Sequence, residues 1–138
     1  MRSDPHSHVV DALERLQRAL LAGDVGAAVE CFVPDGALFG DELGEGAHGH
    51  DELARTFTAI VDRGLGAEWE LDDTWAHLEV DSISFVADAT VFVVVLGRRA
   101  RRRRFRMSGS LRGAGGYYRF ELFNGLDPVL GGGAPAVG

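Results

Sequence analysis

The order of two hydrophobic periodicities along the chain limits the folds that it can adopt. Apolar side chains recur at helical spacing in three early stretches, residues 9–22, 25–32 and 50–63. After residue 66 they alternate at the two-residue spacing of strands, over 67–80, 83–96, 101–112 and 116–124. Helices followed by a meander of long strands predict an α+β fold, with three N-terminal helices packed on a strongly curved antiparallel sheet. Such a sheet can curl around an internal pocket, and its outer face is free to dimerise.

Capping and turn residues set the expected boundaries. Gly23 ends the first helix, Asp24 caps the second, and the segment 40–49, with four glycines in ten residues, is expected to be a loop after a short strand at 37–39. The pair Asp72 and Asp73 suggests a bulge in the first long strand. A chain of 138 residues predicts a single domain, here over 9–126. It would be flanked by a flexible N-terminus (1–8) and a loose Gly/Pro-rich tail (127–138).

Arginine is concentrated in one stretch, "RRARRRRFR" at 98–106, although the net charge of the whole chain is −7. Read as a strand, this run places Arg102, Arg104 and Arg106 on a solvated or dimer-facing side and Arg103 on the side of Phe105 and Met107. Most of the run is therefore interpreted as structural surface that pairs with the acidic first part of the chain. We expect no nucleic-acid binding, and Arg103 alone to reach a pocket rim.

Several classes of protein are disfavoured by what the sequence lacks. A single cysteine, Cys31, excludes an intramolecular disulfide and a cysteine-rich zinc site. No stretch approaches the ~20 apolar residues of a membrane-spanning helix, and the N-terminus does not resemble a signal peptide. A cytoplasmic protein that binds no membrane is expected. No P-loop, G-x-S-x-G or strand-associated G-x-G-x-x-G motif is present, which predicts a protein without a cofactor.

Three segments resemble one known family: "LLAGDVGAAVECFVPDGALFG" at 20–40, "GAHGHDEL" at 46–53 and "GGYYRFELFN" at 115–124. They are similar to the SnoaL-like branch of the nuclear-transport-factor-2-like superfamily. The resemblance implies a cone-shaped α+β fold around a deep hydrophobic pocket, commonly as a dimer. Relatives include polyketide cyclases, ketosteroid isomerase, scytalone dehydratase, limonene epoxide hydrolase and binding modules without catalysis, so the function must be argued from the site.

Asp41 is the first catalytic candidate. It follows the short strand that ends at Phe39, and the resemblance to ketosteroid isomerases implies a general base at this point. A carboxylate shielded by apolar walls can remove a proton from the carbon next to a carbonyl. The alternative is that Asp41, like Glu42 and Glu45, is a solvated loop acid. The second acid of the isomerase has no evident counterpart here.

His48 and His50 flank Gly49 before the third helix. The resemblance implies that His48 points into the cavity, as an acid/base group or polar anchor, whereas His50 is expected to be exposed at the helix N-terminus. The H-x-H spacing matches no closed metal motif, so no metal site is predicted.

The strands supply further candidates. Trp75 and His77 share one strand phase, which faces either the pocket or the outside. Asp88, a lone charge in an apolar strand, is expected to pair with an arginine of the 101–106 strand. In the closing strand Tyr118 and Asn124 stand where the family has a tryptophan and a pocket histidine. The candidate site therefore comprises catalytic Asp41, His48 and His77, and substrate-binding Phe39, Trp75, Arg103, Tyr118 and Asn124.

These residues lead to two hypotheses. The first is a cyclase, isomerase or dehydratase that acts by acid–base chemistry, without a cofactor, on a hydrophobic carbonyl substrate such as a polyketide. The second is a non-catalytic module that binds a hydrophobic ligand or dimerises. In either case a hydrophobic small molecule and a second copy of the chain, bound through the outer face of the sheet, are the expected partners.

Overall fold

The predicted helices and strands occur in the predicted order, and the structure adds a short strand inside the segment expected to be a loop and a short helix after the last strand. A computed structural model describes residues 4–40, 46–114 and 116–130. Its helices are α1 (Pro5–Ala22), α2 (Val25–Glu30), α3 (His50–Asp62) and α4 (Asp127–Leu130). Its strands are β1 (Phe32–Phe39), β2 (Gly46–His48), β3 (Leu65–Leu78), β4 (Ser82–Val95), β5 (Arg98–Ala114) and β6 (Tyr117–Asn124). The α+β class is confirmed, and four helices rather than three occur in the described residues.

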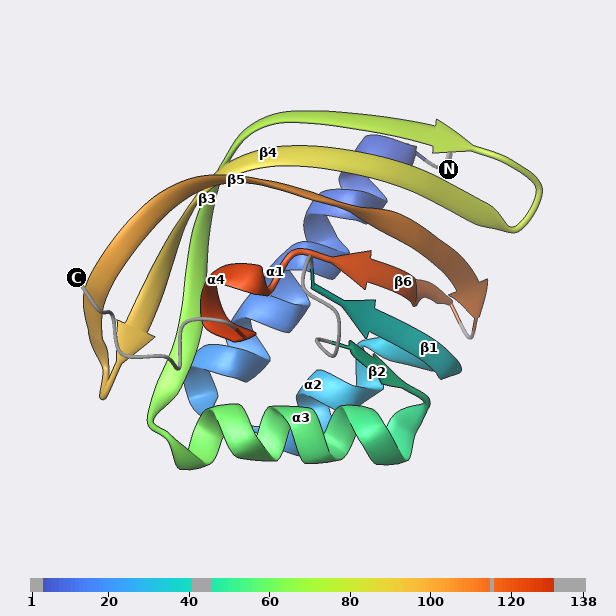
Figure 1. Ribbon diagram of the computed structural model, residues 1–138. Coiled ribbons are helices and arrows are strands. Elements are labelled where there is room, and N and C mark those ends of the chain that lie inside the picture. Colours follow the sequence, from blue (N-terminus) through green and yellow to red (C-terminus); the bar gives the residue numbers. More distant parts are fainter. Residues whose placement is uncertain (1–3, 41–45, 115, 131–138) are drawn as a thin grey trace.

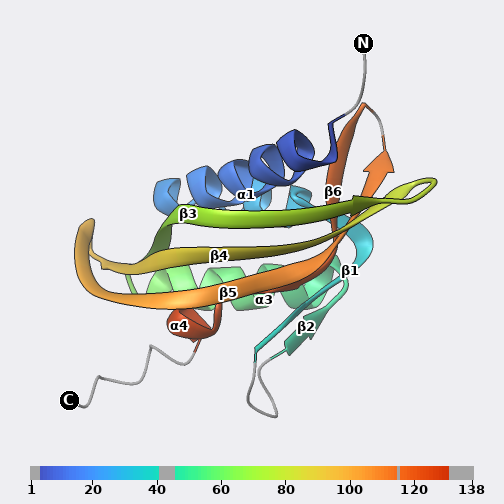
Figure 2. The same ribbon diagram turned by 90° about the horizontal axis from the view of Figure 1, so that it is seen from above.

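The six strands form one open sheet in the order β2-β1-β6-β5-β4-β3. The sheet arches over α1 and α4, and α3 runs below the arch (Figures 1 and 2). Most neighbours are antiparallel, as expected, but β1 and β6 pair in parallel. A parallel pair requires a crossover, and here β2, α3 and the strands β3 to β5 lie between the two strands in the chain.

Local signals explain how α1 and α2 begin. The Asp4 side chain accepts a hydrogen bond from the His6 amide at 3.1 Å, and Pro5 occupies the first turn, so α1 starts before residue 9. The expectation of a flexible segment 1–8 is therefore wrong for residues 5–8. Gly23 ends α1 in the left-handed conformation, and the Asp24 carboxylate caps α2, both as predicted.

The core lies between the helices and the inner, concave side of the sheet. Four aromatic rings from three strands (β1, β4 and β6) meet there, with Phe120 at their centre. Its ring centroid lies 5.4 Å from that of Phe32, 5.9 Å from that of Phe85 and 4.8 Å from that of Phe123. Alternate residues of β4 complete the inner side: Ile83, Phe85, Ala87, Ala89 and Val91, all buried. The opposite residues of β4 lie on the outer face.

Two of the four register shifts in the sheet bear on the candidate site. The first lies between Leu71 and Asp73 of β3, where the aspartate pair predicted it. The second, unexpected, lies between Ser110 and Leu111 of β5, opposite Glu121 of β6. It shifts the phase of β6, so that Phe123 rather than Asn124 joins Phe120 in the core.

The segment after β6 is not a loose extension at its start. Leu126 and Val129 are 0% and 1% exposed, and they anchor α4 in the core on the inner side of the sheet (Figure 1). Their helical spacing lets both side chains point the same way. None of the helices in the described residues is long and apolar enough to cross a membrane.

Candidate functional site

The interior is lined by apolar side chains, and among the described residues it holds a buried polar group without a partner, the indole N–H of Trp69. Trp69 of β3 is 6% exposed and pairs with Val91 on the inner side of the sheet. Its main-chain amide donates to the Gln17 side-chain oxygen of α1 at 2.5 Å, but its indole Nε1 is buried without an acceptor. A buried N–H without an acceptor is costly, since it has lost its hydrogen bond to water. Sequence reasoning missed Trp69 because the strand pattern marks it only as a core aromatic.

Phe39 and His48 lie on the hairpin of β1 and β2. Leu38 and Ala47 face the core, so Phe39 and His48, which alternate with them, point outward and are exposed. The His48 main-chain amide donates to Glu52 at 2.8 Å, which ties the hairpin to α3. Asp41, the candidate base, lies outside the described residues.

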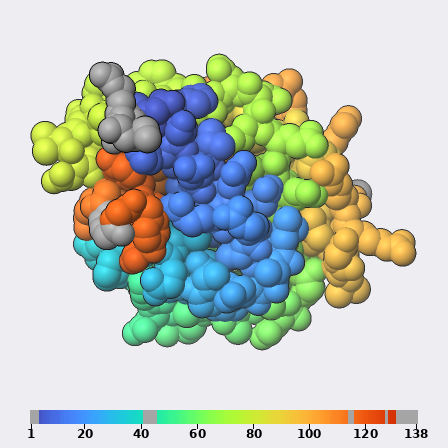
Figure 3. All heavy atoms as spheres, turned by 180° about the vertical axis from the view of Figure 1, so that it is seen from behind, coloured from blue at the N-terminus to red at the C-terminus, as the bar shows by residue number. Residues whose placement is uncertain are grey.

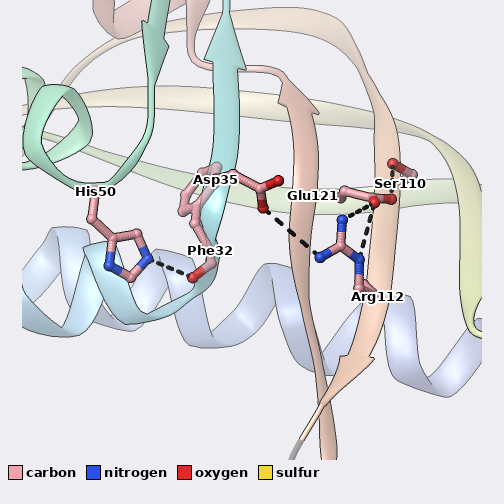
Figure 4. Close-up of polar contacts among 6 residues, drawn as sticks. All are labelled: Phe32, Asp35, His50, Ser110, Arg112 and Glu121. Carbon is pink, nitrogen blue, oxygen red and sulfur yellow. Dashed lines mark hydrogen bonds and ion pairs between the residues drawn. The ribbon is translucent and has the colours of Figure 1, made fainter.

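His50 is half-buried and has a structural contact, contrary to the expectation of an exposed side chain. Its ring Nε2 lies 2.9 Å from the main-chain oxygen of Phe32, as Figure 4 shows. Because a carbonyl only accepts, Nε2 carries the proton in this contact. The bond fixes the first turn of α3 against β1, at a position where Gly49 offers no side-chain cap.

Trp75 and His77 lie on the outer face of the sheet, and this resolves the choice between the two faces. Trp75 pairs with Val86, opposite the core phase of β4, and is 56% exposed. The His77 ring stacks on it, with 6.1 Å between centroids. A shallow hollow of about 440 Å³ surrounds Trp75 and is lined by Asp73, Val86, Asp88 and Arg106.

Acids and arginines face one another across this outer face. Asp88 pairs with an arginine of the 101–106 stretch, as predicted, and the structure identifies it as Arg106, which donates to the carboxylate at 2.6 and 3.1 Å. Arg99 bonds Glu68 at 2.8 Å, and Arg104 bonds Asp72 at 3.3 Å. The interpretation of the arginine run as a strand with a charged outer side is confirmed.

The ion pair between Asp88 and Arg106 should be detectable in an acid titration of Asp88. The hydrogen bond from Arg106, together with its charge, holds the pKa of Asp88 below its ordinary value. A lowered folded-state pKa means that the stabilisation is present above the unfolded value, about 3.9, and is lost as the pH falls through the folded value. An NMR titration of the Asp88 carboxyl carbon should therefore give a midpoint below 3.9, which Arg106→Gln raises. An unchanged midpoint in that variant would refute the assignment.

The three remaining candidates for substrate binding lie in different parts of the fold. Arg103 projects from the inner side of β5, exposed, with its guanidinium carbon 5.1 Å from the centroid of the Phe105 ring. Tyr118 is half-buried against the core and lies 4.5 Å from the His8 ring. Asn124 pairs with Ser108 on the outer face because of the β5–β6 bulge, so it does not face the core as its strand phase suggested.

Figure 4 also shows a polar cluster that links three strands on the outer face. Arg112 of β5 bonds the Glu121 carboxylate of β6, lies 3.8 Å from Asp35 of β1, and shares Glu121 with the Ser110 hydroxyl. Sequence reasoning missed this cluster because it did not predict the bulge at Glu121, whose carboxylate accepts a hydrogen bond from the Ser110 hydroxyl. The cluster holds β1, β5 and β6 in register. Within 4–40, 46–114 and 116–130, no group of three potential metal ligands is found.

The architecture is that of the nuclear-transport-factor-2-like, or cystatin-like, proteins. No protein-family model and no curated protein matches the sequence. A Nostoc punctiforme protein of unknown function with a cystatin-like fold is 22% identical, with a TM-score of 0.70 over 86% of this chain and 87% of that one. The α+β fold of this kind that the sequence resemblance implied is therefore confirmed, whereas the deep internal pocket stays a prediction.

Two further solved structures of this fold are named after enzymes. A ketosteroid isomerase-like protein from Erwinia carotovora is 16% identical, with a TM-score of 0.69 over 90% of this chain and 96% of that one. A scytalone dehydratase-like protein from Novosphingobium aromaticivorans is 11% identical, with a TM-score of 0.72 over 86% and 80%. At these identities the similarity establishes the fold alone.

Proposed function

We propose that the interior of the fold binds a hydrophobic carbonyl compound and that Asp41 acts on it as a general base, without a cofactor. The reaction would be an isomerisation, dehydration or cyclisation, as with polyketide-like substrates. The observation that carries the proposal is the buried indole N–H of Trp69, an unpartnered donor among apolar side chains. The isomerase-like and dehydratase-like proteins of the same fold support the kind of chemistry.

In the proposed reaction Asp41 removes a proton and Trp69 stabilises the negative charge that results. The Asp41 carboxylate takes a proton from the carbon next to the substrate carbonyl, and the electron pair left behind moves onto the carbonyl oxygen. The Trp69 N–H donates to that oxygen as its negative charge develops, an interaction that is strong where water is excluded. Arg103, exposed on the inner side of β5, would hold an acidic group of the substrate at the rim. His48, His77 and Asn124 face outward and take no part in this proposal.

Cyclohex-3-enone tests the proposal, because its isomerisation to the conjugated enone is followed by ultraviolet absorbance. Wild-type protein should accelerate the conversion, and Asp41→Asn should lower the rate about 100-fold, within the usual contribution of a general base. Trp69→Phe should lower it by a similar factor, as loss of an oxyanion donor does. Glu45→Gln, a neighbouring acid, is the matched control and should retain the rate. Equal rates for wild type and Asp41→Asn would refute the base.

One observation favours the second candidate function, a binding module without catalysis. No histidine or carboxylate whose side-chain burial the structure describes is buried. A protein of this kind would carry a hydrophobic ligand and leave the enone unchanged. Native mass spectrometry of freshly purified protein separates the cases, since a co-purified ligand without turnover of the enone supports binding alone.

We also propose that the outer face of the sheet joins two copies of the chain. Acids line β3 and arginines line β5 on this face, so two copies related by a two-fold axis can bring each row opposite the other. Exposed Trp75 lies on the same face and would be covered. Sedimentation velocity should show a dimer that Trp75→Glu dissociates, whereas Arg55→Glu on α3 should not. A wild-type monomer at ~100 μM would contradict the proposal, because specific dimers usually bind more tightly than that.

A further inference from the structure

A hollow of about 360 Å³ lies away from the interior site, where α1, α2 and the start of β6 meet. It is lined by Arg15, Ala27, Glu30, Cys31 and Tyr117 and is called here the α1/α2/β6 hollow. Figure 3 views the molecule from behind and shows α1 in blue, α2 in cyan and β6 in orange meeting at this surface. Ala27, Cys31 and the Tyr117 ring give the hollow largely apolar walls.

Arg15 is held in position in the hollow, and no described carboxylate serves as its counter-ion. Its Nη2 donates to the main-chain oxygen of Tyr118 at 2.6 Å, and its guanidinium carbon lies 4.7 Å from the centroid of the Tyr117 ring. Its Nε is buried without an acceptor. No carboxylate of the described residues lies within ion-pair distance of Arg15. A half-buried cation without a counter-ion favours binding of an anion.

The charges around the hollow favour a single negative charge over a double one. Glu30 lies 3.7 Å from Arg119, whose guanidinium donates to the Tyr117 hydroxyl at 2.7 and 3.1 Å. The positive charges of Arg15, Arg18 and Arg119 all act on Cys31, and Glu30 opposes them. Burial outweighs these charges and raises the pKa of the thiol to about 11, so Cys31 is a neutral, apolar wall. A phosphate dianion would be repelled by Glu30 and would leave the apolar walls unused.

We propose that the α1/α2/β6 hollow binds a small organic monocarboxylate. Its carboxylate pairs with the Arg15 guanidinium, and its apolar or aromatic body lies against Ala27, Cys31 and the Tyr117 ring. Arginine suits this role because its planar fork matches the two oxygens of a carboxylate. The ring of Tyr117 and the Tyr118 carbonyl hold the guanidinium in place beforehand, which reduces the entropy lost on binding.

Benzoate is the probe for this site, with benzamide as its neutral isostere and inorganic phosphate as the bare anion. In an NMR titration we expect benzoate to shift the amide signals of residues 27–31 and of Tyr117 and to leave the Trp69 indole signal in place. The indole reports on the interior, so a result at one site is distinguishable from a result at the other. Arg15→Gln should weaken benzoate binding at least tenfold, whereas Arg55→Gln, an exposed arginine of α3, should not.

A second variant tests the same site in case Arg15→Gln does not fold. Ala27 is exposed on α2, so Ala27→Phe fills the hollow while Arg15 stays in place, and it should also abolish the shifts. The proposal is overturned if benzamide or phosphate binds as tightly as benzoate. It is equally overturned if the shifts centre on Trp69, or if ~20 mM benzoate, already a very weak affinity range, produces none.

Discussion

Gly109→Ala is expected to lower the free energy of unfolding by about 3 kcal/mol, a large part of the total for a domain of this size. A methyl group at this position would collide with the Leu122 main-chain oxygen and would lie 2.8 Å from the Leu122 carbonyl carbon and 3.2 Å from the Phe123 Cα. Because these atoms belong to the backbone of β6, relief requires the paired strands to separate next to the bulge. Urea unfolding followed by circular dichroism measures the change.

Gly26→Ala is the matched control for Gly109→Ala. Gly26 lies on α2, where an added Cβ would meet only Asp24 Oδ1 at 3.7 Å. Alanine should stabilise that helix by about 0.5–1 kcal/mol, since glycine has the greater freedom in the unfolded chain. If the two variants unfolded at the same urea concentration, the close approach of β5 and β6 would not be the reason for glycine at 109.

Phe120→Ala is expected to cost about 3–5 kcal/mol, the range for removal of a buried phenylalanine. Phe120 is fully buried and contacts the rings of Phe32 on β1, Phe85 on β4 and Phe123 on its own strand. Its loss opens a cavity that rigid neighbouring strands cannot fill. Phe39→Ala provides the comparison, because Phe39 is exposed and its loss should change stability by less than about 1 kcal/mol. Similar unfolding midpoints for the two variants would contradict this description of the core.

Periodicity predicted the elements well where it was long and uninterrupted. The three early helices, the long strands, the caps at Gly23 and Asp24 and the bulge at Asp72 all follow from local sequence. The phase of β6 does not, because the bulge between Ser110 and Leu111 depends on how two strands meet. The spacing of Leu126 and Val129 is compatible with the α4 helix, but the glycines and prolines that follow favoured the prediction of a loose tail.

The candidate site was less predictable than the fold. The segment around Trp75 carries polar and apolar residues in both strand phases, so only packing against the helices could settle which phase faces inward. The unpartnered Trp69 N–H depends on its surroundings, which no sequence pattern records. His48 was expected in the cavity because of the resemblance, but the hairpin of β1 and β2 turns both His48 and Phe39 outward.

The parallel pairing of β1 with β6 has a consequence for how the chain acquires its structure. During synthesis β1 and its hairpin partner β2 emerge long before β6, and one edge of β1 remains without hydrogen bonds until Tyr117–Asn124 leave the ribosome. Contacts between such distant segments close slowly, because a large loop must be ordered before they form. The N-terminal half therefore cannot complete its sheet before β6 is synthesised. Until then the exposed edge of β1 is the segment that a chaperone would protect from aggregation.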